Sequence, residues 1–149
     1  MKLQDTVRRI LGQKGSQVYS IPPYSSVFEA LQTLAEKDTG ALVVMQGDAV
    51  VGMLSERDYA RKVFLSGRSS KETLVEEIMS APAVTVSPST TVDECMHVMT
   101  ANRCRHLPVM EDGKVVGVVS IGDLVSWIIT VQDFTIHQLE DYITGGYPG

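Results

Sequence analysis

The sequence predicts an α+β fold made of two copies of one strand-helix-strand-strand-helix unit. Residues 18–64 align on residues 83–129 without a gap, at a constant offset of 65. In each copy, apolar residues at helical spacing alternate with short runs typical of β-strands. A unit of this size usually cannot bury its apolar face alone. We therefore expect the copies to pack face to face about a pseudo-two-fold axis, with a cleft between them.

The alignment also predicts how the chain is organised. With 149 residues, of which 44% are hydrophobic, the chain is long enough for one buried core. We predict one module over residues 1–149. It contains a first repeat (18–66), a connecting segment (67–82), a second repeat (83–130) and a C-terminal helix and tail (131–149).

Composition and charge argue against several classes of partner. The net charge is −5, and the 13 Lys and Arg residues are scattered along the chain. Binding to nucleic acid depends on clustered basic residues, so we expect no nucleic-acid partner. The sequence has no apolar run near the roughly 20 residues of a membrane span and no apolar signal-peptide core at its start. We therefore expect a cytoplasmic protein with no membrane partner.

Each element of the repeat has its own sequence signal. In the first copy, residues 18–21 predict a short strand that Pro22-Pro23 ends. Apolar residues at positions 27, 30, 31, 34 and 35 form the stripe of a helix packed on one side. Residues 42–45 and 49–54 predict two strands joined by a tight turn, with Asp112-Gly113 at the equivalent turn of the second copy. A second helix is expected after Ser55 and after Ser120.

The segments outside the repeats also predict helices. Residues 6–11 and 74–79 each suggest a short helix. The helix that begins at Asp123 is expected to continue until Gly145-Gly146, with apolar residues at positions 128, 131, 136, 139 and 143. That is a large apolar surface for the edge of a small module. Two interpretations stay open, namely burial against the module's first helix and contact with a second copy in a homodimer.

Two Cys-x-His pairs, Cys95/His97 and Cys104/His106, offer four ligands of the type that zinc prefers. On a helix, however, positions 95 and 97 lie about 200° apart. We therefore predict a buried Cys95 and a surface His97 rather than a metal site.

The main chemical signal is the motif Gly-x-x-Ser-x-x-Asp, present as residues 52–58 and 117–123. In each copy it places a hydroxyl and a carboxylate three residues apart where a strand turns into a helix. One interpretation is a capping box, in which Ser caps the helix and Asp reaches back to the cap residue. The other is a nucleotide site, in which the helix start and the Ser hydroxyl bind phosphate and the Asp accepts from the ribose hydroxyls.

With these motifs, the chain resembles a tandem pair of cystathionine-β-synthase (CBS) domains, which are regulatory sensors of adenosine nucleotides. The segment Arg105-His106-Leu107-Pro108-Val109 is similar to the family's pocket strand, and the flanks resemble the small stand-alone proteins with two CBS domains. The resemblance implies that backbone groups of the first two strands read the adenine. The implied site residues are Ser20, Gly40, Ala41 and Leu42 in one copy, Thr85, Arg105, His106 and Leu107 in the other, and Ser55, Asp58, Ser120 and Asp123 for ribose and phosphate.

The two predicted sites are not equivalent. The first motif contains Arg57 where the second has Gly122, whereas the second pocket strand has Arg105-His106 where the first has Gly40-Ala41. We therefore expect Arg57 to serve one cleft and Arg105 with His106 to serve the other.

These features favour a regulatory module over an enzyme. The expected ligands are AMP, ADP, ATP or NAD, with S-adenosylmethionine less favoured, and the expected partners are a second copy of the chain and an unidentified regulated protein. The sequence has no Walker loop, no Gly-x-Gly-x-x-Gly after a strand and no catalytic Ser/His/Asp or Cys/His set within an evident pocket motif, so we expect neither catalytic residues nor an obligatory cofactor. A protein-interaction scaffold with vestigial nucleotide pockets is the alternative.

Overall fold

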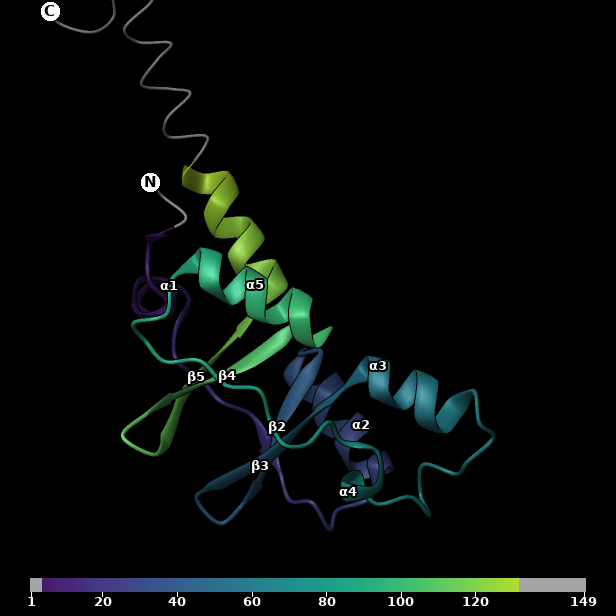
Figure 1. Cartoon of the computed structure of the whole chain (residues 1–149). Helices are drawn as coiled ribbons and strands as arrows, with labels where there is room; N and C mark the ends of the chain where they lie inside the picture. Colours follow the sequence, from purple (N-terminus) through teal and green to yellow (C-terminus); the bar gives the residue numbers. More distant parts are fainter. Residues whose placement is uncertain (1–3, 132–149) are drawn as a thin grey trace, which may run out of the picture.

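The computed structural model describes residues 4–131 and contains both repeats (Figure 1). The first repeat has the order β1 (Ser20–Ile21), α2 (Val27–Lys37), β2 (Ala41–Gln46), β3 (Ala49–Ser55), α3 (Glu56–Tyr59) and a π-helical turn, η2 (Ala60–Phe64). The second has α5 (Val92–Asn102), β4 (His106–Glu111), β5 (Lys114–Ser120) and a final helical segment of residues 121–131. The predicted α+β fold is confirmed.

The duplication extends to the pairing of individual residues between neighbouring strands. In the first repeat β2 lies between β1, which is parallel to it, and β3, which is antiparallel. The second repeat has the antiparallel pair β4-β5, and its first strand is reduced to a parallel bridge between Val86 and Val109. That bridge matches the pair Ile21 and Val44 of β1 and β2 at the offset of 65. The two repeats therefore share one backbone plan.

The two helices outside the repeats cross over to complete them. Helix α1 (Val7–Lys14) lies against the second repeat, and helix α4 (Val75–Ile78) lies against the first (Figure 1). The amide of Val7 donates to Thr90 O at 2.9 Å, and the amide of Val75 donates to Ser25 O at 2.8 Å. Each repeat is thus completed by the helix that precedes the other repeat in the chain.

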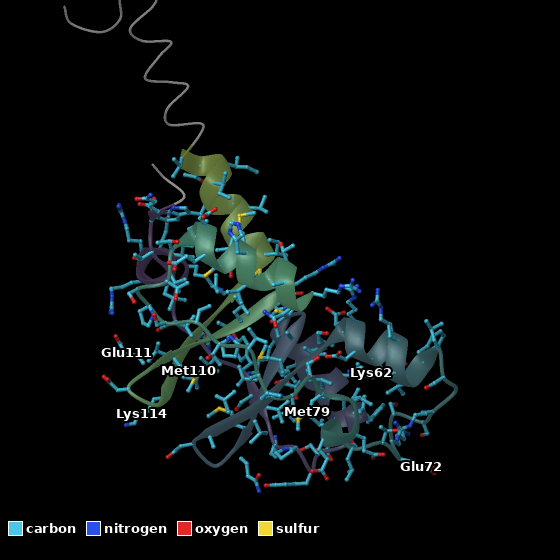
Figure 2. All side chains as sticks on the ribbon, in the orientation of Figure 1. Lys62, Glu72, Met79, Met110, Glu111 and Lys114 are labelled. Carbon is cyan, nitrogen blue, oxygen red and sulfur yellow. The ribbon has the colours of Figure 1, made fainter. Side chains whose placement is uncertain are left out.

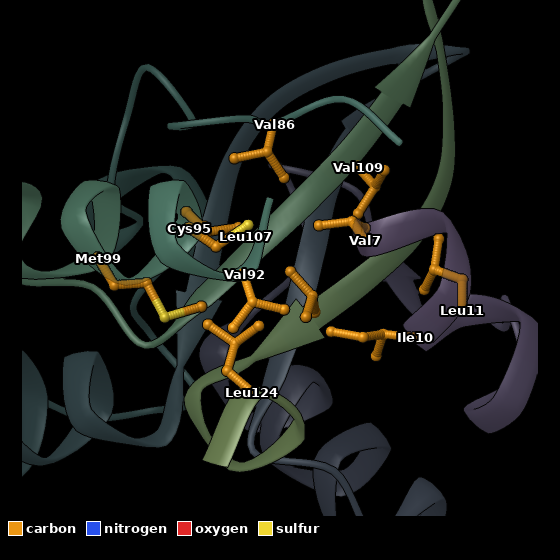
Figure 3. Packing of buried hydrophobic residues seen from close by; sticks show 11 residues of the cluster. Val7, Ile10, Leu11, Val86, Val92, Cys95, Met99, Leu107, Val109 and Leu124 are labelled. Atoms are coloured by element: carbon orange, nitrogen blue, oxygen red, sulfur yellow. The ribbon is translucent and has the colours of Figure 1, made fainter. Parts of the chain in front are cut away.

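Three apolar clusters follow from this crossover. In the cluster of the second repeat, Val7, Ile10 and Leu11 come from α1 and face Cys95 and Met99 of α5 (Figure 3). The cluster of the first repeat contains Val75 and Ile78 of α4 among residues of α2, β2 and β3. A third cluster joins the two repeats, because Ala41, Val43 and Met53 of the first pack against Ala83 and Val118 of the second.

The final helical segment packs against the module's own first helix over the residues that the structure describes. Leu124 is fully buried, and Trp127 Nε1 donates to Asp5 Oδ2 at 2.9 Å. The guanidinium of Arg9 lies 5.9 Å from the centre of a Trp127 ring. Val125 and Ile129 on this segment are exposed. The predicted apolar positions 136, 139 and 143 lie outside the described residues.

Two glycines allow the crossing helices to approach the strands. A Cβ on Gly52 of β3 would lie 2.8 Å from Ser80 O and 2.9 Å from Met79 Sδ (Met79 is labelled in Figure 2). A Cβ on Gly117 of β5 would lie 2.8 Å from Cδ1 of Leu11. The same motif glycine therefore meets the crossing segment in both repeats.

We expect Gly52→Ala to destabilise the protein more than Gly117→Ala, because a backbone carbonyl cannot move aside as a leucine methyl can. Overpacking typically costs about 1–3 kcal/mol, which corresponds to a fall in melting temperature of several degrees for a chain of this size. Thermal denaturation followed by circular dichroism measures both variants. Equal melting temperatures for the two would show that the Ser80 contact does not limit the packing.

Candidate functional site

Both Ser-x-x-Asp motifs form complete capping boxes. The amide of Asp58 donates to Ser55 Oγ at 3.2 Å, and the amide of Ser55 donates to Asp58 Oδ2 at 2.9 Å. In the second repeat the amide of Asp123 donates to Ser120 Oγ at 3.1 Å, and the amide of Ser120 donates to Asp123 Oδ2 at 2.8 Å. The capping interpretation of the motif is therefore confirmed, and each turn holds its carboxylate in a fixed place.

A lysine accompanies each of these carboxylates. Lys62 Nζ, on the helical segment after β3, lies 3.4 Å from Asp58 Oδ1 (Figure 2). Lys14 Nζ of α1 lies 2.7 Å from Asp123 Oδ2 and donates to Val118 O at 2.9 Å. Within residues 4–131 the hydrogen bonds and ion pairs of Asp123 use Oδ2. Its Oδ1 can therefore still accept a hydrogen bond from a ligand, so capping does not exclude ligand binding.

The first capping box borders a cavity of about 440 Å³, which we call cavity A. Its walls are the turn of residues 55–58, the segment 80–84 and the segment 102–106. The volume lies in the range of about 300–1,000 Å³ that is typical of small-molecule sites. Cavity A therefore takes its Ser-x-x-Asp turn from the first repeat and its opposite wall from the second.

The second capping box borders a cavity of about 340 Å³, which we call cavity B. Its walls include Ser120 and Asp123 of the second repeat, Lys14 beside Asp123, and Tyr19 and residues 38–41 of the first repeat. Residues 38–41 correspond to residues 103–106 of cavity A at the offset of 65. The two cavities are thus related by the pseudo-symmetry of the repeats.

The structure brings most of the predicted site residues to these two cavities. Gly40, Ala41 and His106 line both of them. Leu42 and Leu107 are fully buried in the apolar clusters and line neither cavity. Ser20 and Thr85 are exposed and, among the described residues, are not part of either wall.

The expected division of the basic residues is wrong. Arg57 and Arg105 were expected in different clefts, but both line cavity A, together with His106. The pseudo-two-fold arrangement explains this result, because it sets the turn of one repeat opposite the strand start of the other. Charges that lie in different repeats of the sequence therefore meet in one cavity.

Sequence reasoning also missed four basic residues, namely Arg61, Lys62 and Arg103 in cavity A and Lys14 in cavity B. Arg61 and Lys62 follow Arg57 and Asp58 by four residues, so helical spacing could have found them. Alignment of the repeats matches Arg103 with Asp38, and this change of charge could have indicated that Arg103 is a site residue. Lys14 lies outside the repeats, and no sequence signal links it to Asp123.

The Cys-x-His pairs do not converge on one point. Cys95 is buried in the second cluster and His97 is exposed, which confirms the predicted placement of both. Burial raises the pKa of the Cys95 thiol to about 11, so it stays protonated at neutral pH. No group of three or more His, Cys, Asp or Glu side chains within residues 4–131 could hold a metal ion.

None of the helices described within residues 4–131 has both the length and the apolar character of a membrane span.

The sequence model of the CBS domain matches residues 7–64 and 75–130, and both matches begin at the crossing helices α1 and α4. The chain belongs to the CBS-domain family. The matched regions cover most of the chain, so the tandem CBS pair accounts for the fold, the crossover and the two cavities.

The chain is similar to known CBS-domain proteins. The chain is 41% identical to the mitochondrial CBS domain-containing protein CBSX3 of Arabidopsis thaliana over 82% of its own length, and it spans 62% of that relative. It is 30% identical to YhcV of Bacillus subtilis, with coverage of 73% of this chain and 77% of the relative. A solved CBS-domain protein from Burkholderia ambifaria is 50% identical, with a TM-score of 0.81 and coverage of 84% and 94% of the two chains.

His106 borders both cavities, so its ionisation affects the boundary between them. Burial lowers the pKa of His106, and the positive charges of Lys14 and Arg105 act in the same direction, while Asp123 and Glu56 oppose them. The folded protein therefore binds fewer protons at this residue than the unfolded chain does between the lowered pKa and the ordinary value near 6.5. Stability should fall as the pH drops through that window.

We expect the melting temperature to fall between about pH 7.5 and about pH 5.5, and His106→Gln to reduce that fall, because glutamine does not titrate. Carboxylates with ordinary or lowered pKa values stay largely ionised in this range. His97→Gln removes an exposed imidazole outside the cavities and serves as the control, which should follow the unsubstituted protein. An unchanged pH dependence in His106→Gln would mean that burial of this imidazole does not contribute.

Proposed function

We propose that this CBS pair is a regulatory sensor that binds adenosine nucleotides in cavities A and B and thereby modulates a partner protein. The observation that carries the proposal is the pair of pseudo-symmetric cavities, each with a Ser-x-x-Asp turn on one wall and the strand start of the other repeat on the opposite wall. Membership of the CBS family and the provisional assignment of the Burkholderia ambifaria relative to signal transduction support it.

The walls of cavity A supply the chemistry that such a ligand needs. Met53, Ala83 and Val84 offer apolar contact for a base. The Asp58 carboxylate is held beside the cavity by its capping box and can accept from ribose hydroxyls. The basic side chains on both walls can donate to phosphate oxygens.

Binding between the repeats also provides a route to regulation. A ligand in either cavity would contact both repeats, and the apolar cluster that joins them contains Ala41 and Met53, which also line cavity A. A ligand changes a conformational equilibrium only by binding one arrangement more tightly than another. A ligand that contacts both repeats would bind more tightly to the arrangement that makes all of those contacts, so the proposal is regulation rather than catalysis, with the cytoplasmic location expected from the sequence.

We also propose that the module works as a homodimer. The hexameric CBS-CP12 protein from bloom-forming cyanobacteria, which is 27% identical with a TM-score of 0.72, shows that a related chain assembles into oligomers. On this chain, Val125 and Ile129 leave apolar side chains exposed on the final helical segment.

Sedimentation velocity at micromolar concentration should give twice the chain mass of 16.3 kDa. The double substitution Val125→Ser with Ile129→Ser should shift the distribution toward monomer, because it removes exposed apolar surface without touching the core. Tyr24→Ser, which changes a side chain 69% exposed on the first repeat, is the control and should leave the distribution unchanged. A concentration-independent monomer would contradict the dimer.

AMP and ATP should each raise the melting temperature, because a ligand at a hundred times its dissociation constant adds about 2.7 kcal/mol of stability. Asp58→Ala and Asp123→Ala should each remove one binding site and thus part of the shift. Both variants keep the capping serine but lose the carboxylate that accepts from its amide, so they should melt at a lower temperature without ligand. The experiment is differential scanning fluorimetry with and without nucleotide.

Glu94→Ala is the matched control for the lost cap. Glu94 closes the capping box of Thr91 at the start of α5 and lines neither cavity. This variant should melt at a lower temperature but keep the full nucleotide-induced shift. A full shift in the Asp58→Ala/Asp123→Ala double variant would show that the carboxylates act only as caps, and no shift with any nucleotide would favour the scaffold with vestigial pockets.

A further inference from the structure

Cavities A and B share a backbone plan but carry opposite charge. Cavity A is lined by the carboxylates of Glu56 and Asp58 and by five Arg or Lys side chains, which are Arg57, Arg61, Lys62, Arg103 and Arg105. Cavity B is lined by two carboxylates, Asp38 and Asp123, and one cation, Lys14. Without His106, which borders both, the formal charge is +3 (five minus two) around cavity A and −1 (one minus two) around cavity B.

The difference arises at every basic position of cavity A. At the offset of 65, Arg57 corresponds to Gly122, Arg61 to Ser126 and Lys62 to Trp127. In the other direction, Arg103 corresponds to Asp38 and Arg105 to Gly40. Each cation of cavity A is thus replaced by a neutral or acidic residue at the equivalent position of the other repeat.

The arginines of cavity A also differ from the other arginines of the chain in their partners. Arg8, Arg9 and Arg68 form ion pairs with Glu111, Asp5 and Glu77 respectively. The four arginines that line cavity A form no ion pair with any residue in the range 4–131. A protein with a net charge of −5 therefore gathers four guanidinium groups without carboxylate partners around one cavity.

Such a cluster fits a ligand with several negative charges. Mutual repulsion among like charges is relieved when an anion binds between them. Guanidinium groups form paired hydrogen bonds to phosphate oxygens, and these charge-assisted bonds are stronger than neutral ones. In cavity B the single ammonium of Lys14 already contacts Asp123 at 2.7 Å, and Asp38 adds a second negative charge.

We propose that cavity A selects adenosine ligands that carry a polyphosphate chain, such as ATP, whereas cavity B takes adenosine ligands with one phosphate or none. This inference rests on the proposed function, because it assumes that both cavities bind adenosine ligands. It assigns the two sites different ligand classes within one chain.

The test measures the affinity of each cavity separately by isothermal titration calorimetry. Asp123→Ala leaves cavity A intact, and Asp58→Ala leaves cavity B intact. The probes are adenosine, AMP and ATP at low salt with EDTA, which keeps divalent cations from neutralising the phosphates. In Asp123→Ala we expect ATP to bind at least tenfold more tightly than AMP, and in Asp58→Ala we expect ATP to bind no more tightly than AMP.

Substitution of the arginines links that preference to the charge cluster. In the Asp123→Ala chain, Arg61→Gln or Arg105→Gln should reduce the ratio of ATP affinity to AMP affinity about tenfold and change adenosine affinity much less. Arg8→Gln removes the same charge from a residue paired with Glu111 outside both cavities and is the matched control, which should keep the ratio. Because the cavity arginines are exposed, raising the salt concentration should weaken the binding of ATP more than the binding of adenosine.

The outcomes separate the inference from the proposed function. If adenosine, AMP and ATP bind cavity A with equal affinity, the charge assignment is overturned while the nucleotide sensor stands. If ATP binds more tightly to Asp58→Ala than to Asp123→Ala, the assignment is likewise overturned. If none of the probes binds the unsubstituted chain, the proposed function fails and the inference fails with it.

A second experiment does not depend on cap variants, which could impair folding. The double variant Arg61→Gln with Arg105→Gln keeps both capping boxes and all core residues. In this chain ATP should lose affinity at its tighter site by more than tenfold, and AMP should bind within about threefold of the unsubstituted protein. Unchanged ATP affinity in a folded double variant overturns the inference.

Discussion

The reciprocal crossing of α1 and α4 is the constraint on which the rest of the structure depends. Neither repeat has a complete apolar cluster without the helix that the chain supplies from before the other repeat. Val7, Ile10 and Leu11 fill one cluster, and Val75 and Ile78 fill the other. The two repeats therefore stabilise each other through exchanged helices as well as through their shared cluster. This interlocking fixes the relative position of the repeats and so the shape of the cavities between them.

The same crossing explains why the motif glycine and the motif carboxylate occur together. Gly52 and Gly117 lie where the crossing segments press on the strands, three residues before the capping serines. Each of these strands packs closely against a crossing segment, which requires the glycine, and leads directly into a helix, whose first turn the carboxylate helps to cap. In each repeat the turn then delivers a carboxylate to the cavity wall. Packing and site geometry therefore have a common origin in residues 52–58 and 117–123.

Duplication preserved the backbone of the two sites and left their charge free to change. The parallel pairs Ile21/Val44 and Val86/Val109 and the bulges after Val44 and Val109 recur at equivalent positions. The side chains that line the cavities are under no such constraint, because exposed polar residues contribute little to folding stability. Five basic positions in cavity A consequently have no basic counterpart in the other repeat. A symmetric scaffold thus carries two chemically different clefts.

The sequence alone determined the repeat, the capping turns and the order of elements apart from the first strand of the second copy, which forms only a single bridge. These features depend on local periodicity and on residue spacing within one copy. Helical stripes, turn residues and the Ser-x-x-Asp spacing are short-range signals, because each depends only on residues that are close together in the sequence. The sequence also identified Ser55, Asp58, Ser120, Asp123, Arg57, Arg105 and His106, all of which line the cavities. Only the tertiary structure decided which of them meet. Helix exchange and the pseudo-two-fold packing join residues more than 40 positions apart, such as Arg57 with Arg105 and Lys14 with Asp123, and no local pattern encodes those contacts.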